Sequence, residues 1–190
     1  MIKKKESEIL CISGSPRKGH TEYILRQISD KLGAELILLR DKNIGLCKGC
    51  MHCLKSFDCI MKDDSQDIID KMHKSNLIIF GIPNYFNNVS GLFKNFTDRL
   101  LPLYKNKTVC RNEAIKGKKV LFVFVGGGGE KGTEEDVYNA LSSATRGMVK
   151  YLDLEVVGEY PFVSSESLGI RPQQSKIDEM IAQIQNIKLK

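Results

Sequence analysis

The sequence predicts an α/β fold of the doubly wound type, in which helices cover both faces of a parallel sheet. Three observations support this prediction. Short apolar runs alternate with amphipathic stretches along the 190 residues. Residues 120–125 are apolar throughout, as expected of a strand buried on both faces in the middle of a parallel sheet. Helical periodicity returns between the expected strands, which is the strand–helix–strand pattern.

Five strands and five helices are expected along the chain. The strands are expected at residues 8–13, 34–39, 77–82, 120–125 and 154–160. The helices are expected at residues 20–32, 65–73, 91–104, 134–151 and 173–187, from apolar residues at helical spacing. Gly33 should end the first helix, and Pro83 should close the third strand. We expect one domain over residues 1–190, with a cysteine-rich insertion at about 45–62.

Charge and composition exclude several classes of function. The net charge is +6, but the basic residues are scattered rather than gathered with aromatics, so no nucleic-acid partner is expected. No apolar run reaches the roughly 20 residues that span a bilayer, and residues 9–12 are too short a run for an export signal. We therefore expect a cytoplasmic protein without a membrane partner, in a reducing compartment where disulfides are rare.

The segment after the first strand has the features of a phosphate site. Ligands of such sheets bind beyond the carboxyl ends of the strands, and a helix start there favours an anion. The hydroxyls of Ser13, Ser15 and Thr21 add donors, and Arg17 adds a positive charge. The segment has neither the glycine pattern of a dinucleotide-binding domain nor that of a P-loop. The alternative is a plain Gly/Ser/Pro turn before a helix.

Two motifs carry a family resemblance. The first is Gly14-Ser15-Pro16-Arg17 with Thr21, which resembles the phosphate loop of the NADPH-dependent FMN reductase family. The second resembles that family's segment after the third strand and consists of Pro83, Tyr85, Ser90-Gly91, Lys94 and Asp98-Arg99. The resemblance covers residues 8 to about 160.

The resemblance implies a flavodoxin-like sheet of strand order 2-1-3-4-5, non-covalent FMN, NAD(P)H as a co-substrate and a homodimer or homotetramer. The FMN-binding residues that it implies lie in three segments. They are Ser13, Ser15, Pro16, Arg17, His20, Thr21, Pro83, Asn84, Tyr85, Phe86, Asn87, Gly126, Gly127 and Gly128. His20 departs from the family, which often has Asn at that position.

The second motif also supports predictions from the residues themselves. Of Tyr85 and Phe86, we expect one in the core and one near the flavin. Ser90 should cap the following helix, and Lys94 and Asp98 should form a pair at helical spacing, while Arg99 should be structural. The glycine run from Gly126 indicates either close backbone approach to a flat cofactor or a flexible loop.

Four of the six cysteines form a compact cluster, C-x2-C-x2-C-x5-C, made of Cys47, Cys50, Cys53 and Cys59. Thiolates at this spacing can reach the corners of one iron–sulfur cubane. The pattern resembles the motif of the archaeal and bacterial iron–sulfur flavoproteins, which implies a [4Fe–4S] cluster with these four ligands. Zinc, and cysteines that stay as thiols or form disulfides, remain alternatives. Cys11 is expected in the core.

Three functions follow from these features. The first is an iron–sulfur flavoprotein that exchanges electrons with ferredoxin-like or small-molecule partners. The second is a cluster-free NAD(P)H-dependent FMN or quinone reductase. The third is a non-catalytic FMN-binding redox sensor. We expect no catalytic acid or base, because the cofactors supply the redox chemistry.

Overall fold

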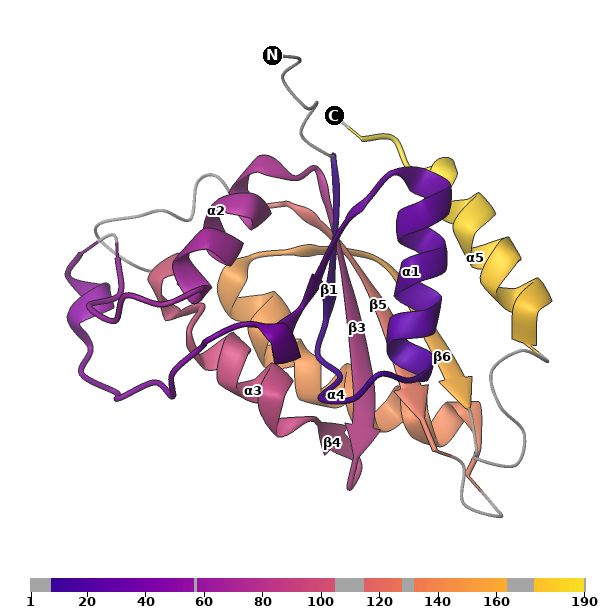
Figure 1. Cartoon of the computed structure of the whole chain (residues 1–190), viewed down its shortest axis with the longest axis horizontal. Coiled ribbons are helices and arrows are strands. Elements are labelled where there is room, and N and C mark those ends of the chain that lie inside the picture. Colours follow the sequence, from indigo (N-terminus) through magenta and orange to yellow (C-terminus); the bar gives the residue numbers. More distant parts are fainter. Residues whose placement is uncertain (1–7, 57, 105–114, 128–131, 164–172, 190) are drawn as a thin grey trace.

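A computed structural model describes residues 8–56, 58–104, 115–127, 132–163 and 173–189, and it contains the predicted parallel sheet (Figure 1). Its parallel strands are β1 (Ile9–Ser13), β2 (Glu35–Leu38), β3 (Leu77–Tyr85), β5 (Lys119–Gly126) and β6 (Glu155–Val163). They lie in the order β2-β1-β3-β5-β6, which is 2-1-3-4-5 when the parallel strands are counted along the chain. A short strand, β4 (Asn88–Val89), pairs antiparallel with the end of β3.

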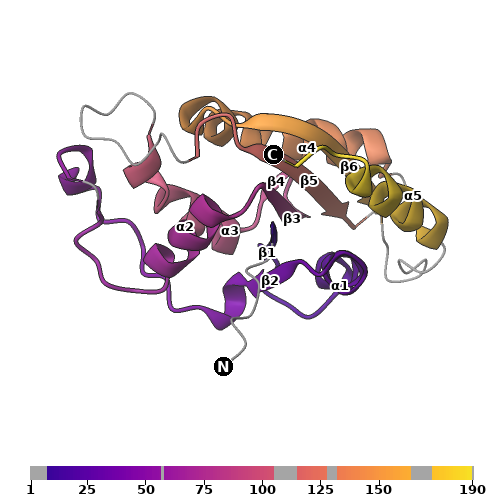
Figure 2. The same ribbon diagram turned by 90° about the horizontal axis from the view of Figure 1, so that it is seen from above.

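Helices cover both faces of the sheet, as predicted (Figure 2). On one face lie α1 (His20–Leu32) and α5 (Gln174–Gln185), and on the other lie α2 (Ser65–Lys74), α3 (Gly91–Asp98) and α4 (Glu134–Leu152). Strand β1 illustrates why: Leu10 and Ile12 pack with α2, α3 and α4, whereas Ile9 and Cys11 pack with α1 and α5. Successive side chains of a strand point to opposite faces of the sheet, so each strand contributes residues to both hydrophobic cores. In the part of the chain that the structure describes, no helix has the length and apolar character needed to cross a membrane.

Among the described residues, three short 3-10 helices lie in the connections between the longer elements. They are η1 (Leu39–Asp41), η2 (His52–Leu54) and η3 (Leu101–Leu103). The first follows β2. The second lies in the cysteine-rich insertion at about 45–62, called the cysteine loop from here on, and it contacts η3. The predicted end of the first helix at Gly33 is confirmed, since Gly33 has φ 65° and its N–H bonds to Ser29 O, the left-handed conformation that glycine adopts without penalty.

Strand β3 is longer than predicted and does not close at Pro83. It runs through Pro83 to Tyr85, and Pro83 stands opposite Val125 of β5. The pairing of β1 with β3 ends at Gly81, so the later part of β3 lacks β1 as a neighbour. A proline, which has no N–H to donate, is tolerated where a strand has such an open side.

The helix expected at residues 91–104 divides into two parts. The α-helical part α3 ends at Asp98, and the 3-10 helix η3 follows with Pro102 inside it. A proline at this position removes a helical hydrogen bond and restricts the residue before it. The apolar periodicity correctly predicts a helical segment, but Pro102 ends the α-helix early.

Candidate functional site

The carboxyl ends of β1, β3 and β5 lie at one edge of the sheet, at the bottom of Figure 1. The phosphate loop (residues 13–21), the β3–β4 hairpin and the start of the glycine segment leave from this edge. In a doubly wound sheet this is the edge at which ligands bind. Gly128 lies outside the described residues. The other predicted FMN-binding residues belong to the three segments that leave from this edge.

The start of the phosphate loop is held between β3 and α3. The N–H of Gly14 donates to the carbonyl of Gly81 at 2.8 Å, and the hydroxyl of Ser90 donates to the carbonyl of Gly14 at 2.6 Å. A Cβ atom at position 14 would stand 2.8 Å from Cβ of Phe93. Glycine is thus required at position 14 for the approach of α3, and the loop is rigid at its base. The predicted cap is confirmed, since the hydroxyl of Ser90 accepts from the N–H of Phe93 at 3.1 Å.

The hydroxyl groups of the phosphate loop are buried at the start of α1. Ser13, Ser15 and Thr21 are each at most 3% exposed. The Ser15 N–H donates to Ser13 Oγ at 3.4 Å, and Ser15 Oγ donates to the carbonyl of Arg17 at 2.9 Å. These contacts fold the loop into a turn, from which Pro16 and Arg17 extend into solvent.

The start of α1 fits an anion. Its N-cap residue is Gly19, and no side chain caps this end of the helix. The first N–H groups of an α-helix have no partner within the helix, and the helix dipole places partial positive charge there. Half-buried His20 is the first residue of α1. A phosphate group bound here would receive the donors that a capping side chain otherwise supplies.

Sequence reasoning missed a charged network under this loop. Glu22, 1% exposed, forms ion pairs with Arg26 at 2.7 Å and with Arg40 at 2.6 Å. Burial would raise the pKa of Glu22, but hydrogen bonds from Arg40 and Arg26 outweigh burial and lower it. Arg40 also donates to the carbonyl of Arg17 at 3.4 Å. The two guanidinium groups thus balance a carboxylate beside the anion site, and the only signal in the sequence was the position of Arg40 just after β2.

The hairpin after β3 corrects one prediction. Neither Tyr85 nor Phe86 lies in the core: Tyr85 is 37% exposed and Phe86 is fully exposed. Tyr85 pairs with Asn88, and the two residues between them, Phe86 and Asn87, have φ values of 51° and 56°. This is the geometry of a type I′ turn, which forces side chains outward and is strained for Phe. The turn therefore presents an aromatic ring to solvent at the ligand edge.

The next residue inward, Asn84, has an unsatisfied oxygen. Its Oδ1 is buried and has no hydrogen-bond partner among the described residues. Leaving a buried acceptor without a donor costs about 1–3 kcal/mol. A flavin ring carries an N–H group at its edge, so a bound flavin would supply the missing donor. Together with the uncapped start of α1, this orphaned oxygen means that the residues present fit FMN.

The glycine segment has a structural role at its first position. Gly126 is the last residue of β5 and is buried. A Cβ atom there would lie 2.2 Å from Cγ2 of Val137 in α4. The close approach at Gly126 is therefore to helix α4. Gly127 is exposed at the ligand edge.

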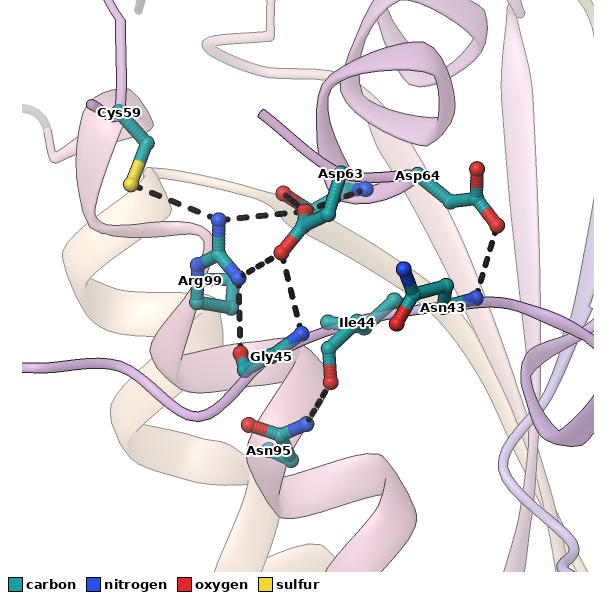
Figure 3. Close-up of polar contacts among 9 residues, drawn as sticks. Asn43, Ile44, Gly45, Cys59, Asp63, Asp64, Asn95 and Arg99 are labelled. Carbon is teal, nitrogen blue, oxygen red and sulfur yellow. Dashed lines mark hydrogen bonds and ion pairs between the residues drawn. The ribbon is translucent and has the colours of Figure 1, made fainter. Parts of the chain in front are cut away.

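The cysteine loop is anchored at its base by polar contacts (Figure 3). The Asn43 N–H donates to Asp64 Oδ2 at 2.8 Å, and Asn95 Nδ2 of α3 donates to the carbonyl of Ile44 at 2.8 Å. Arg99, which follows α3, forms an ion pair with Asp63 at 2.6 Å. The two flanks of the loop, near residues 43–45 and 63–64, are thus joined to each other and to α3.

Asp63 is ionised in this environment. Burial would raise the pKa of Asp63, but hydrogen bonds from Arg99, from Ser65 and from the Gly45 N–H lower it to about 2. Arg99 as a whole residue is 2% exposed, and the pairing of its guanidinium with Asp63 and Cys59 raises its pKa against the effect of burial. The sequence predicted that Arg99 is structural but gave no indication that Asp63 is its partner. The predicted Lys94–Asp98 pair is confirmed, at 2.5 Å.

The four cysteines differ in their surroundings. Cys47 and Cys50 are exposed, Cys53 is buried in η2 and Cys59 is partly buried. Within the described ranges, no three His, Cys, Asp or Glu side chains stand close enough to hold a metal ion. Four thiols on one short loop nevertheless form a donor set that suits an iron–sulfur cluster. Cys11 is fully buried as predicted, and burial raises the pKa of its thiol far above the usual value.

A family model described as NADPH-dependent FMN reductase matches residues 7–168. The chain belongs to the NADPH-dependent FMN reductase family. The resemblance seen in the two sequence motifs is therefore confirmed, and with it the expected flavodoxin-like type of fold.

Relatives and solved structures agree with this family. An iron–sulfur flavoprotein of Archaeoglobus fulgidus is 45% identical over 97 residues, which cover 48% of either chain. The chain spans about half the length of this relative and of two further curated iron–sulfur flavoproteins that it matches. The Trp repressor binding protein from Bacillus subtilis has a TM-score of 0.69 at 16% identity, covering 95% of this chain and 99% of that chain. An NAD(P)H:quinone oxidoreductase from Methanothermobacter marburgensis has a TM-score of 0.68 at 13% identity, with 95% and 96% covered. These two structures share the fold.

Proposed function

We propose that this protein is an FMN-dependent oxidoreductase that also carries a [4Fe–4S] cluster. The observation that carries the flavin assignment is the set of buried hydroxyls at the uncapped start of α1. There the loop from Ser13 to Thr21 would hold the FMN phosphate. The hairpin residues 83–87, with the orphaned Asn84 oxygen, and the glycine segment 126–128 would lie along the isoalloxazine ring.

The cysteine loop is assigned to the cluster on the chemistry of its donors. Cys47, Cys50, Cys53 and Cys59 are the proposed ligands, and of these Cys47, Cys50 and Cys59 are free thiols. The Archaeoglobus fulgidus relative is named an iron–sulfur flavoprotein, which supports the same assignment. To bind one cluster, the loop between its anchored flanks would have to bring the four sulfur atoms together.

The two cofactors would divide the work. When bound, an iron–sulfur cluster supplies one-electron transfer, and FMN supplies chemistry that links one-electron and two-electron partners. The residues of the chain would position these groups, and the burial of Ser13 and Ser15 keeps bulk water away from their hydroxyls. NAD(P)H is the proposed co-substrate, and a ferredoxin-like protein or a small molecule is the proposed electron partner.

A second function is supported by the fold comparison. The NAD(P)H:quinone oxidoreductase from Methanothermobacter marburgensis shares the fold of this chain, as expected of a cluster-free NAD(P)H-dependent FMN or quinone reductase. In that case the cysteines would act as thiols or take no part. Steady-state NAD(P)H oxidation by protein that holds FMN but no iron would support this second function.

One crossed experiment tests both assignments. Ser15→Asp places a carboxylate where the phosphate is proposed to bind, so FMN affinity should fall at least about 100-fold, or about 3 kcal/mol. Cys50→Ala removes one ligand, so iron should be lost while FMN stays bound. Both are read by fluorescence titration of FMN and by iron analysis.

The matched control for the added charge is Ser143→Asp, on the exposed side of α4, which should bind FMN like the wild type. Ser15→Asp protein that folds and keeps wild-type FMN affinity would contradict the phosphate site. Cys50→Ala protein that keeps wild-type iron would contradict the ligand assignment.

A further inference from the structure

The buried side chain of Arg99 contacts the cysteine loop at several points. Arg99 donates through Nη1 to the Gly45 carbonyl at 2.7 Å and to Asp63 Oδ2 at 2.6 Å. Through Nη2 it donates to Asp63 Oδ1 at 3.2 Å and to Cys59 Sγ at 3.5 Å (Figure 3). Gly45 precedes the first cysteine of the cluster motif and Asp63 follows the last. One guanidinium group therefore contacts both flanks of the loop and one of its thiols.

The contacts of Asp63 fix this guanidinium in place. The Asp63 carboxylate accepts from the Gly45 N–H at 3.0 Å, and from the N–H and hydroxyl of Ser65 at 3.1 and 2.7 Å. A carboxylate held by this many donors offers a fixed edge for the two-pronged contact with Arg99. The planar guanidinium cannot turn away from Cys59 without losing that contact.

Cys59 is the cysteine of the motif for which such an anchor matters most. Cys47, Cys50 and Cys53 follow each other at two-residue spacing, whereas five residues separate Cys53 from Cys59. A longer spacer leaves the fourth thiol with more conformational freedom, and ordering it costs more entropy. The contact with Arg99 reduces that cost before any cluster is bound.

We propose that Arg99 is a positioning residue for the iron–sulfur centre. It holds Cys59 at the base of the loop, ready to act as the fourth ligand, and its N–H group bonds to the ligand sulfur in the loaded protein. This inference rests on the cluster assignment made above. A hydrogen bond from a cation to a ligand sulfur stabilises the more negative, reduced cluster, so Arg99 raises the reduction potential of the cluster.

Three variants separate this role from a general structural one. Arg99→Gln removes both the charge and the planar two-pronged donor group of the guanidinium, whereas Arg99→Lys keeps only the charge. Asn95→Ala removes the loop contact with the Ile44 carbonyl while leaving Arg99 in place. Iron per FMN is measured after anaerobic reconstitution, and the cluster potential is measured by titration followed with electron paramagnetic resonance. Arg99→Gln should hold several-fold less iron and shift the potential to more negative values.

The other two variants give the expected contrast. Arg99→Lys should recover part of the potential shift but not the iron content, because lysine lacks the planar fork. Asn95→Ala should keep the wild-type potential. The proposal is overturned if Arg99→Gln keeps both the iron content and the potential of the wild type, or if Asn95→Ala shifts the potential equally.

A measurement on iron-free, FMN-loaded protein tests the anchoring by itself. Hydrogen exchange in residues 43–46 and 58–65 should rise at least about 10-fold in Arg99→Gln, with β1 and β5 unchanged. Unchanged exchange in the loop would overturn the positioning role. Wild-type protein that never binds iron would instead contradict the cluster assignment, while this exchange result still decides whether Arg99 anchors the loop.

A double variant keeps the test valid if Arg99→Gln fails to fold. Arg99→Gln alone leaves the Asp63 carboxylate buried without its counter-charge, which can unfold a protein. The same measurements on the double variant Asp63→Asn/Arg99→Gln remove both charges together. A double variant that folds and keeps wild-type loop exchange would likewise overturn the proposal.

Discussion

Asp63 and Arg99 act as a pair whose two members lie 36 residues apart in the chain. The pairing is not visible in the sequence, because Asp63 is one of two adjacent acids before a helix and the motif that contains Arg99 names no partner for it. What makes them important is burial: their side chains are 7% and 1% exposed. At this depth each charge depends on the other, so removal of either leaves an uncompensated charge inside the protein.

This pair predicts a specific pH dependence of stability. The folded-state pKa of Asp63, about 2, lies below the ordinary value of 3.8. The contribution of ionised Asp63 to the free energy of unfolding is therefore fully present at pH values well above 3.8. It is lost as the pH falls below 3.8 towards 2. Asp63→Asn should destabilise the protein by about 3 kcal/mol at pH 7. At pH 3 the difference in unfolding free energy between wild type and variant should be smaller by about 1 kcal/mol.

Urea unfolding followed by circular dichroism at both pH values measures this difference. The control is Asp30→Asn, which removes an exposed carboxylate of α1 and should leave the pH dependence of the wild type unchanged. A gap between wild type and Asp63→Asn that is the same at pH 7 and pH 3 would show that Asp63 does not supply this dependence.

Two elements at the ligand edge combine local strain with close packing. The β3–β4 hairpin places Phe86 in a left-handed conformation, and β5 ends on a glycine that admits helix α4. Strain of this kind often accompanies a binding site, where the surrounding structure holds it in place. We therefore expect opposite effects on stability: a glycine introduced in the hairpin should stabilise the fold, whereas a side chain added at the end of β5 should destabilise it.

Phe86→Gly should stabilise the hairpin and weaken flavin binding. Glycine adopts the turn conformation freely, so the melting temperature should rise, corresponding to about 1 kcal/mol. Loss of the aromatic ring should weaken FMN binding about 10-fold. Thermal unfolding without FMN and fluorescence titration with FMN measure the two effects. Phe86→Tyr, which keeps the ring and the strain, should match wild type in both; unchanged FMN affinity in Phe86→Gly would remove Phe86 from the site.

Gly126→Ala should destabilise the fold by about 1–3 kcal/mol, because the added methyl group overlaps Val137. Val137→Ala in the same chain should recover part of this loss, which a double-mutant cycle of urea unfolding would measure. The control is Gly147→Ala in α4, where a Cβ atom meets nothing within 4 Å, and which should stabilise by up to about 1 kcal/mol. If the changes in unfolding free energy caused by Gly126→Ala and Val137→Ala simply add, the predicted contact between these two positions is ruled out.

At the scale of the whole molecule, the periodicity of the sequence predicted the sheet and both helical layers. The reason is that each strand must bury two faces, as Leu10 and Cys11 do on opposite sides of β1. Sequence could not predict where β3 loses its neighbour β1, so its continuation through Pro83 was missed. It also could not predict contacts between distant segments, which is why the network of Glu22 with Arg40 went unseen.

The candidate site was predictable to a similar degree. The turn and the helix start that follow β1 could be predicted from local rules, since Gly, Ser and Pro favour a turn and α1 begins directly after Gly19. The exposure of Phe86 and the roles of Gly14 and Gly126 depend on packing against α3 and α4, which no local pattern encodes. The contact of Arg99 with Asp63 at the base of the cysteine loop joins residues that are 36 positions apart, so no local pattern encodes it either.

The most direct test of the central claim is the cofactor content of the protein purified without oxygen. The visible spectrum is recorded, and FMN, iron and acid-labile sulfide are measured per chain. The account predicts one FMN together with about four iron and four sulfide, and the broad absorbance of an iron–sulfur cluster beneath the flavin bands. FMN without iron, even after anaerobic reconstitution, would contradict the cluster and leave the cluster-free reductase as the function.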